Sequence, residues 1–183
     1  KVNGVLSMII EAQRSGFKEI FIPEENAAEG KLVTGIDVYT HSNLRQLIEH
    51  LQGKIKMQPL PKENILQNLD RAYDVDFADV KGQPVARRAL EIAAAGGHSI
   101  LMMGAPGCGK TMLARRLVTI LPPVTEAEAL EITKIYSIVN MLPETESVMI
   151  ERPFRSPHHS VSASALLGGG TYPMPGEVTL SHN

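Results

Sequence analysis

Residues 104–111 read GAPGCGKT, a stretch in which three glycines come directly before a lysine and a threonine. The spacing fits the pattern of glycine, four residues, glycine, lysine, then serine or threonine, which is typical of loops that surround phosphate groups. An apolar run at 99–103 (SILMM) predicts a strand before the loop, and apolar periodicity predicts a helix over 110–121 after it. This strand-loop-helix context favours a phosphate-binding loop over a flexible surface turn.

Each residue type in the loop has a physical role in that chemistry. Glycines at 104, 107 and 109 let successive N–H groups turn inward, and the start of the following helix adds its positive end. We expect Lys110, the catalytic candidate, to reach the β and γ phosphates, and the Thr111 hydroxyl to bind the Mg²⁺ that ATP carries. The predicted ATP-binding residues of this stretch are Gly104, Ala105, Pro106, Gly107, Cys108, Gly109, Lys110, Thr111 and Met112.

Composition sets the broad class. The chain has 183 residues, 43% of them hydrophobic, and a formal net charge of −2, so it can form one ordinary domain or two small ones and has no broad basic field. One cysteine, Cys108, excludes a disulfide framework and predicts a cytoplasmic protein, and no run is long enough to span a membrane. Cys108 is either a small residue at a tolerant loop position or a reactive thiol at a helix start. Because the chain starts with Lys1, we expect a piece of a longer protein.

The first half predicts a small α/β unit. Helical spacing over 4–14, apolar strand signals at 17–23 and 36–39, and a helix capped by Ser42 or Asn43 give the order helix, strand, strand, helix. The acidic stretch 24–30 (EENAAEG) between the strands is expected to be a solvated loop. We predict an α/β unit over 1–52 and a proline-broken linker over 53–74, with one short helix near 63–69.

The second half, residues 75–183, predicts a second α/β pattern. It contains a helix over 84–95 that ends at Gly96 and Gly97, the strand at 99–103, the glycine loop and its helix. Thr125 and Glu128 predict a capping box for a third helix. A short helix is expected over 160–167, and the stretch 177–180 (EVTL) predicts a strand.

Segments outside the loop carry a resemblance to a known family. Residues 76–117 (FADVKGQPVARRALEIAAAGGHSILMMGAPGCGKTMLARRL) resemble the start of an AAA+ ATPase module. Together with RPFRSPHHSVSASALLGGG and PMPGEVTLSHN they resemble the magnesium-chelatase-like ComM/YifB family. The resemblance implies a P-loop AAA+ core, here truncated, in an ATPase that works as a hexameric ring and remodels DNA during transformation. It also implies that Val80, Gly82 and Gln83 contact the adenine.

The first unit resembles the end of a Lon-type protease domain, an S5 domain 2-like fold, through GVLSMIIEAQRSGFKEIFIPEEN. Lon proteases have a catalytic lysine at the position that Ser7 matches, and their serine nucleophile lies upstream of this chain. A serine hydroxyl cannot act as the base for another serine, so we expect a structural or docking role and no proteolysis.

The resemblance places the acidic residue that hydrolysis requires after Asn183. We therefore expect this chain to bind ATP and Mg²⁺ weakly and to hydrolyse ATP little. In the stretch 152–159 (RPFRSPHH), Arg152, Arg155, His158 and His159 are either contacts to DNA phosphates or a neighbouring subunit, or solvated side chains of a rigid connector. Two other functions stay open: a protein-interaction scaffold that uses the Lon-like unit, and a metal-chelatase subunit.

Overall fold

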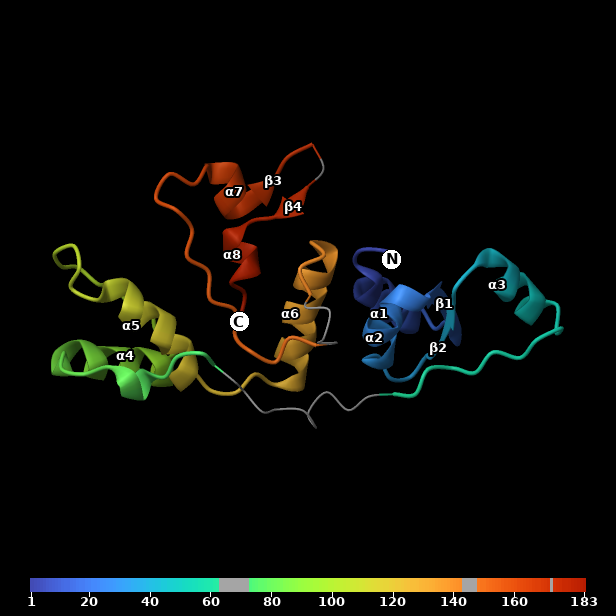
Figure 1. Cartoon of the computed structure of the whole chain (residues 1–183), viewed down its shortest axis with the longest axis horizontal. Helices are drawn as coiled ribbons and strands as arrows, with labels where there is room; N and C mark the ends of the chain where they lie inside the picture. Colours follow the sequence, from blue (N-terminus) through green and yellow to red (C-terminus); the bar gives the residue numbers. More distant parts are fainter. Residues whose placement is uncertain (63–72, 143–147, 172) are drawn as a thin grey trace.

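The computed structural model describes residues 1–62, 73–142, 148–171 and 173–183 as a mixed α/β fold. The chain extends along one axis, with α3 (Leu44–Leu51) at one end and α4 (Pro84–Gly96) and α5 (Lys110–Leu117) at the other (Figure 1). Between these ends lies α6 (Glu126–Ile138), with the C-terminal elements beside it. In the described part of the chain, no helix is both long enough and apolar enough to cross a bilayer.

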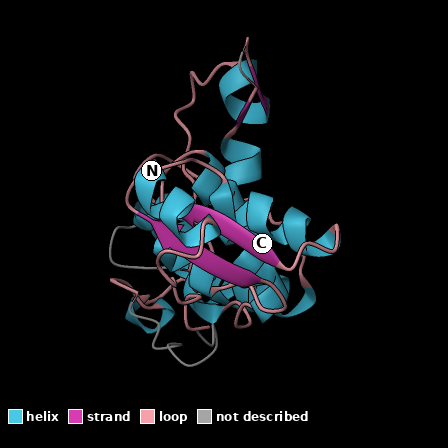
Figure 2. Cartoon of the chain, turned by 90° about the vertical axis from the view of Figure 1, so that its right-hand side faces the viewer, coloured by secondary structure: helices cyan, strands magenta, loops and turns pink. Residues whose placement is uncertain are grey.

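The predicted order of helix, strand, strand and helix in the first half is confirmed. Two parallel strands pair from Glu19 with Asp37 to Pro23 with His41, and they lie side by side with helices around them (Figure 2). Asn43 caps α3 as expected, since its side chain accepts a hydrogen bond from the Gln46 amide. The elements are α1 (Val5–Arg14), β1 (Glu19–Pro23), η1 (Glu24–Asn26), α2 (Ala27–Lys31), β2 (Asp37–His41) and α3.

The main apolar core packs this unit against α6, which follows the predicted linker in the sequence. We call it the first core; Leu6 and Ile9 of α1, Val38 of β2 and Ile132 of α6 are at most 1% exposed in it. Gly30 of α2 allows close packing, because a Cβ there would lie 2.9 Å from side-chain atoms of Ile22, Val38 and Leu60. The first core thus depends on contacts between residues far apart in sequence.

The acidic stretch 24–30 is not the solvated loop that we predicted. It forms η1 and α2, and Asn26 and Glu29 are 1% and 5% exposed. The Glu29 carboxylate accepts hydrogen bonds from the Leu6 amide (3.2 Å), the Asn26 side chain (2.8 Å) and the Ser137 hydroxyl (2.5 Å). These bonds satisfy a polar group that would otherwise be costly to bury, and they fasten α1 and α2 to α6.

The phosphate-loop half has a smaller core. Phe77, Val80, Leu90 and Leu113 form it, and we call it the loop core. The predicted helices are present as α4, with Gly97 in a left-handed conformation after it, and as α5 followed by η4 (Val118–Ile120). The capping box of Thr125 and Glu128 at the start of α6 is also confirmed.

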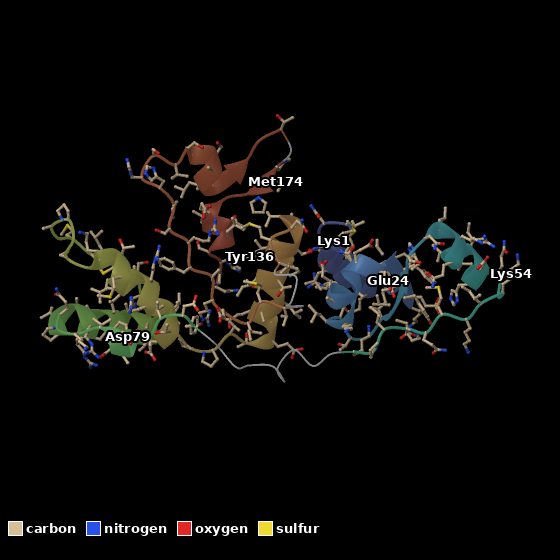
Figure 3. The ribbon with its side chains drawn as sticks, in the orientation of Figure 1. Lys1, Glu24, Lys54, Asp79, Tyr136 and Met174 are labelled. Atoms are coloured by element: carbon tan, nitrogen blue, oxygen red, sulfur yellow. The ribbon has the colours of Figure 1, made fainter. Side chains whose placement is uncertain are left out.

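Two strand predictions are wrong in this half. Residues 99–103 form no strand, and Leu101 and Met103 are 81% and 86% exposed, because no strand in the described ranges pairs with this run. The stretch 177–180 is the short helix α8 (Glu177–Leu180). A hydrogen bond from the Tyr136 hydroxyl to the Leu180 carbonyl (3.1 Å) holds this helix against α6, and Figure 3 marks Tyr136 between the two.

The remaining C-terminal elements are short. The helix expected over 160–167 is present as α7 (Ala163–Leu167), and β3 (Gly168–Gly169) pairs antiparallel with β4 (Met174–Pro175). In the predicted linker, the Leu60 amide donates a hydrogen bond to the Val38 carbonyl (2.7 Å), so its first part packs on β2. The short helix predicted near 63–69 lies outside the described residues.

Candidate phosphate-binding site

The glycine loop connects residues 99–103, which form no strand, to α5. Gly107 and Gly109 have φ of +78° and +91°, a region that other residues rarely adopt, and the helix begins at Lys110 directly after Gly109. Glycine adopts these φ values without steric conflict, and the positive end of α5 comes directly after the loop. The helix start at Lys110 agrees with the sequence prediction, whereas the strand predicted before the loop is absent.

Most loop amides are free to bind a ligand. Cys108 donates a 3.4 Å hydrogen bond to the Ala105 carbonyl, and the Leu113 amide donates to the Gly109 carbonyl. In the described ranges, the N–H groups of Gly107, Gly109, Lys110 and Thr111 have no hydrogen-bond acceptor. These N–H groups could therefore donate hydrogen bonds to an anion without breaking a bond to a described residue.

The Lys110 ammonium bonds to the loop itself. Its Nζ donates to the Gly104 and Ala105 carbonyls at 2.9 and 2.8 Å and lies 3.5 Å from the Cys108 Sγ. The side chain is thus held over the loop rather than pointing into solvent. An incoming phosphate would compete with two neutral carbonyls for this cation, and charge-assisted bonds to phosphate are the stronger of the two.

A cavity of about 510 Å³ lies beside the loop. Gly104, Cys108 and Lys110 line it on one side, and Gln83 lines it from the start of α4. This volume lies within the range of ordinary small-molecule sites. Of the three residues implied as adenine contacts, the structure brings Gln83 to the loop cavity.

Val80 and Gly82 lie elsewhere. Val80 is 1% exposed in the loop core, and Gly82, with φ of +72°, borders a different depression next to Arg87 and Arg88. Their backbone shapes the turn that positions Gln83, which itself has φ of +50°. Val80 and Gly82 therefore support the position of Gln83 and do not line the cavity themselves.

The other loop residues are open to solvent. Ala105, Pro106, Thr111 and Met112 are exposed, and the Thr111 hydroxyl forms no hydrogen bond with any described residue. A free hydroxyl at the start of α5 suits the Mg²⁺ of a bound nucleotide, because hard cations prefer oxygen ligands. Cys108 is an exposed free thiol.

Two further side chains help to position the site, and the sequence analysis did not predict them. Arg116 of α5 donates to the Asp76 carbonyl at 3.1 Å, and Thr119 accepts a hydrogen bond from the Phe77 amide at 3.1 Å. They attach the turn before α4, including η3 (Phe77–Asp79), to the helix after the loop. Sequence spacing gives no signal for these contacts, since the paired residues lie far apart along the chain.

The two arginines of RPFRSPHH are bound within the chain. Arg155 makes a two-bond ion pair with Glu177, at 2.6 and 2.7 Å. These bonds hold the pKa of the Glu177 carboxyl below its usual value. Arg152 donates to the Pro122 carbonyl (2.9 Å) and pairs with Glu128 (3.4 Å). Both cations therefore support the fold around α6 and α8.

His158 and His159, the last two residues of this segment, are exposed. Their rings lie 4.0 Å apart, and His158 Nδ1 accepts a hydrogen bond from the Ser160 amide at 3.3 Å. Among the residues that the structure describes, no group of three or more His, Cys, Asp and Glu side chains is arranged to hold a metal ion. The structure does not bring the histidines to the glycine loop.

Several known proteins have sequences similar to this one. Residues 76–183 match the family described as magnesium chelatase, subunit ChlI. The chain is 43% identical over 183 residues to the YifB protein of Salmonella typhimurium and 42% identical over 185 residues to the competence protein ComM of Haemophilus influenzae. It is also 40% identical over 184 residues to Rv2897c of Mycobacterium tuberculosis. The alignments with YifB and ComM cover all of this chain, and the alignment with Rv2897c covers 99% of it. They cover 35% to 36% of the length of each relative.

The family match covers the phosphate loop, α4 to α8 and the RPFRSPHH segment, whereas the relatives also align with the first α/β unit. The chain spans about a third of the length of these relatives. It belongs to the magnesium chelatase family, among the ComM/YifB-like proteins.

Proposed function

We propose that this chain is the ATP-binding part of an AAA+ ATPase. The observation that carries the proposal is the loop at 104–111, where unpaired amides, the start of α5 and the Lys110 ammonium meet beside a cavity of about 510 Å³. The triphosphate would lie on the loop amides, with Lys110 leaving the Gly104 and Ala105 carbonyls for the β and γ phosphates. Gln83 would contact the base.

Magnesium and hydrolysis complete the proposal. The Thr111 hydroxyl would hold the ion that ATP carries, and the ion would neutralise charge on the phosphates. Hydrolysis also needs an acidic residue that orients water, which we place in a longer protein beyond Asn183. We therefore propose that the chain binds ATP and turns it over slowly.

The longer protein would be a cytoplasmic ring ATPase, with a hexamer as its working form and DNA as the substrate that it remodels. Family membership and the similarity to a protein named for competence support this part of the proposal. We keep the division into a Lon-like unit at 1–52, a linker at 53–74 and an AAA+ part at 75–183. Because Arg152 and Arg155 are engaged within the chain, a role for them at DNA or at a neighbouring subunit requires that their ion pairs open.

One alternative has a specific observation in its favour. Helix α3 buries none of its residues, and Leu44, Ile48 and Leu51 are 66%, 43% and 67% exposed at the spacing of one helical face. A scaffold that recruits a partner through the first unit would use such a face. A metal-chelatase subunit is the other alternative, and the family description supports it.

Titration with a fluorescent ATP analogue tests the proposal. Wild type should bind in the presence of Mg²⁺ and Lys110→Ala should lose at least about tenfold in affinity, because a charge-assisted contact to phosphate is removed. Lys81→Ala is the matched control, since Lys81 is an exposed lysine that does not line the cavity. Equal affinity of wild type and Lys110→Ala would contradict the proposal.

The scaffold alternative predicts a different effect of Lys110→Ala in the longer protein. There, Lys110→Ala should abolish motor activity if the ATPase proposal holds, whereas a nucleotide-independent scaffold would keep its partner. Replacement of Leu44 and Leu51 by serine would then remove that partner without changing ATP affinity.

A further inference from the structure

A second cavity, of about 460 Å³, lies apart from the phosphate loop and shares no lining residue with the first cavity. It is formed by α5 and η4, by α6, by residues 73–75 and by the start of RPFRSPHH. We call it the aromatic pocket and define it by Tyr73, Asp74, Arg115, Tyr136 and Phe154, which all line it. Nothing in the proposed phosphate chemistry uses these five side chains.

Two rings in the aromatic pocket lack partners. Phe154 is 38% exposed, and no aromatic ring among the described residues packs against it. The Tyr73 hydroxyl is shielded from solvent and has no hydrogen-bond partner among the described residues, whereas the Tyr136 hydroxyl donates to the Leu180 carbonyl. A buried hydroxyl without a partner is rare in folded proteins, so its position calls for a ligand group that can bond to it.

The charged groups are of both signs, and two of them are free. Arg115 of α5 and Asp74 are exposed and form no ion pair or hydrogen bond within the described part of the chain. The other two charged residues that line the pocket, Arg152 and Glu151, already have partners. The pocket thus offers one guanidinium and one carboxylate together with an exposed aromatic ring.

We propose that the aromatic pocket binds one nucleotide unit at a site separate from the phosphate loop. A nucleobase has a flat face that stacks on an exposed ring such as Phe154, and its phosphate matches a free guanidinium such as Arg115. A carboxylate accepts hydrogen bonds from the exocyclic amino groups of cytosine, adenine and guanine, and thymine has no such group. Asp74 therefore gives the pocket a preference for bases that carry an amino group.

The nucleotide unit has two possible sources, a free nucleotide or a single strand with one base splayed out. A strand source connects the pocket to the proposed action on DNA and rests on that proposal, while a free nucleotide does not. Arg115 belongs to α5, which begins at the phosphate loop. A ligand in the aromatic pocket would therefore contact the same helix as a phosphate on the loop.

The experiment measures the fluorescence anisotropy of short labelled oligodeoxycytidylate and oligothymidylate strands with the 183-residue chain at low salt. We expect tighter binding of the cytosine strand, a loss of about tenfold for Phe154→Ala and loss of the base preference for Asp74→Asn. Arg115→Gln should weaken both strands and reduce the salt dependence by about one phosphate contact. Far-ultraviolet circular dichroism checks that each variant is folded.

Matched controls are Phe17→Ala and Arg14→Gln in the first unit, which should bind as wild type does. Phe17 is an exposed ring, and Arg14 is an exposed arginine without an ion pair to any described residue. Competition by free deoxycytidine monophosphate, lost in Phe154→Ala, identifies a free nucleotide as the source. Failure of that competition, together with weaker binding of an abasic strand, identifies a single strand.

Wild-type affinity in both Phe154→Ala and Arg115→Gln would overturn the proposal, as would equal binding of the abasic strand without competition by the nucleotide. Lys110→Ala separates this site from the phosphate loop, because it should lose ATP and retain the cytosine strand. Loss of the strand in Lys110→Ala alone, with Phe154→Ala unaffected, would place the strand at the phosphate loop and also overturn the proposal.

Discussion

The first core and the loop core differ in how completely each is enclosed. The first core buries side chains from α1, β1, β2 and α6 on several sides of a paired sheet. The loop core buries Phe77, Val80, Leu90 and Leu113, and the run beside it leaves Leu101 and Met103 more than four-fifths exposed. The first core is enclosed by elements from both sides of the predicted linker, whereas the loop core lies beside an exposed apolar run that another strand could cover.

Substitution of one leucine in each core should give the largest effect. Leu6 and Leu90 are both 0% exposed, and Leu→Ala at such sites costs about 2–5 kcal/mol. Leu6→Ala should speed amide hydrogen exchange in α1, α2 and α6 together and leave ATP affinity unchanged. Leu90→Ala should speed exchange in α4 and α5 and weaken ATP binding. Exchange that rises equally in all five helices for either variant would show one common core.

The polar joint between α6 and the first unit should give the next largest effect. Ser137→Ala removes the hydroxyl that donates to the buried Glu29 carboxylate, so about 1–3 kcal/mol of unfolding free energy should be lost. Urea denaturation measures the loss, and Ser15→Ala, an exposed serine of the first unit, is the matched control. A Ser137→Ala variant as stable as the control would mean that Glu29 does not hold α6.

The smallest effect concerns the ion pair of Arg155 and Glu177, which fastens α8 outside both cores. Arg155 lowers the pKa of Glu177 from the ordinary value of 4.5, so the pair stabilises the fold above that pH and the contribution disappears as the pH falls further. Both side chains are about one quarter exposed, which limits the contribution to about 1 kcal/mol.

Thermal unfolding of wild type and Glu177→Gln tests this pair. The two proteins should differ between pH 7 and pH 5, and the difference should shrink as the pH falls below 4.5 and the Glu177 carboxyl becomes protonated. Lys81→Ala again serves as a surface control, with no change in pH dependence. A difference that grows as the pH falls would contradict the assignment.

Local signals in the sequence predict local structure well here. Glycine at 107 and 109, the lysine and threonine after them and the capping box at Thr125 each act within a few residues, and the structure has the loop, the helix start and the cap that they predict. Strands β1 and β2 were also predictable, because the sequence has short strand signals at 17–23 and 36–39.

Long-range contacts explain what the sequence did not predict. The stretch 177–180 has strand-forming residues, yet Arg155 and Tyr136 hold it as a helix from far along the chain. Glu29 looked solvated because its partners, Leu6 and Ser137, lie in other elements. The run at 99–103 has the composition of a strand, but a strand also needs a neighbour to pair with.

In the site, the motif predicted the free amides and the position of Lys110, but it could not show that the ammonium bonds to its own loop. That bond depends on the loop conformation around Gly104 and Ala105. Gln83 reaches the cavity through a turn that Arg116 and Thr119 hold, and no spacing rule predicts that arrangement.

Backbone amide chemical shifts recorded during titration with Mg-ATP test the central claim most directly. The account predicts large shifts at Gly107, Gly109, Lys110 and Thr111, whose N–H groups have no acceptor in the described chain, and almost none at the amides of the first core. It also predicts that Lys110→Ala removes these shifts. Unchanged loop amides at saturating Mg-ATP, or shifts confined to the first core, would contradict it.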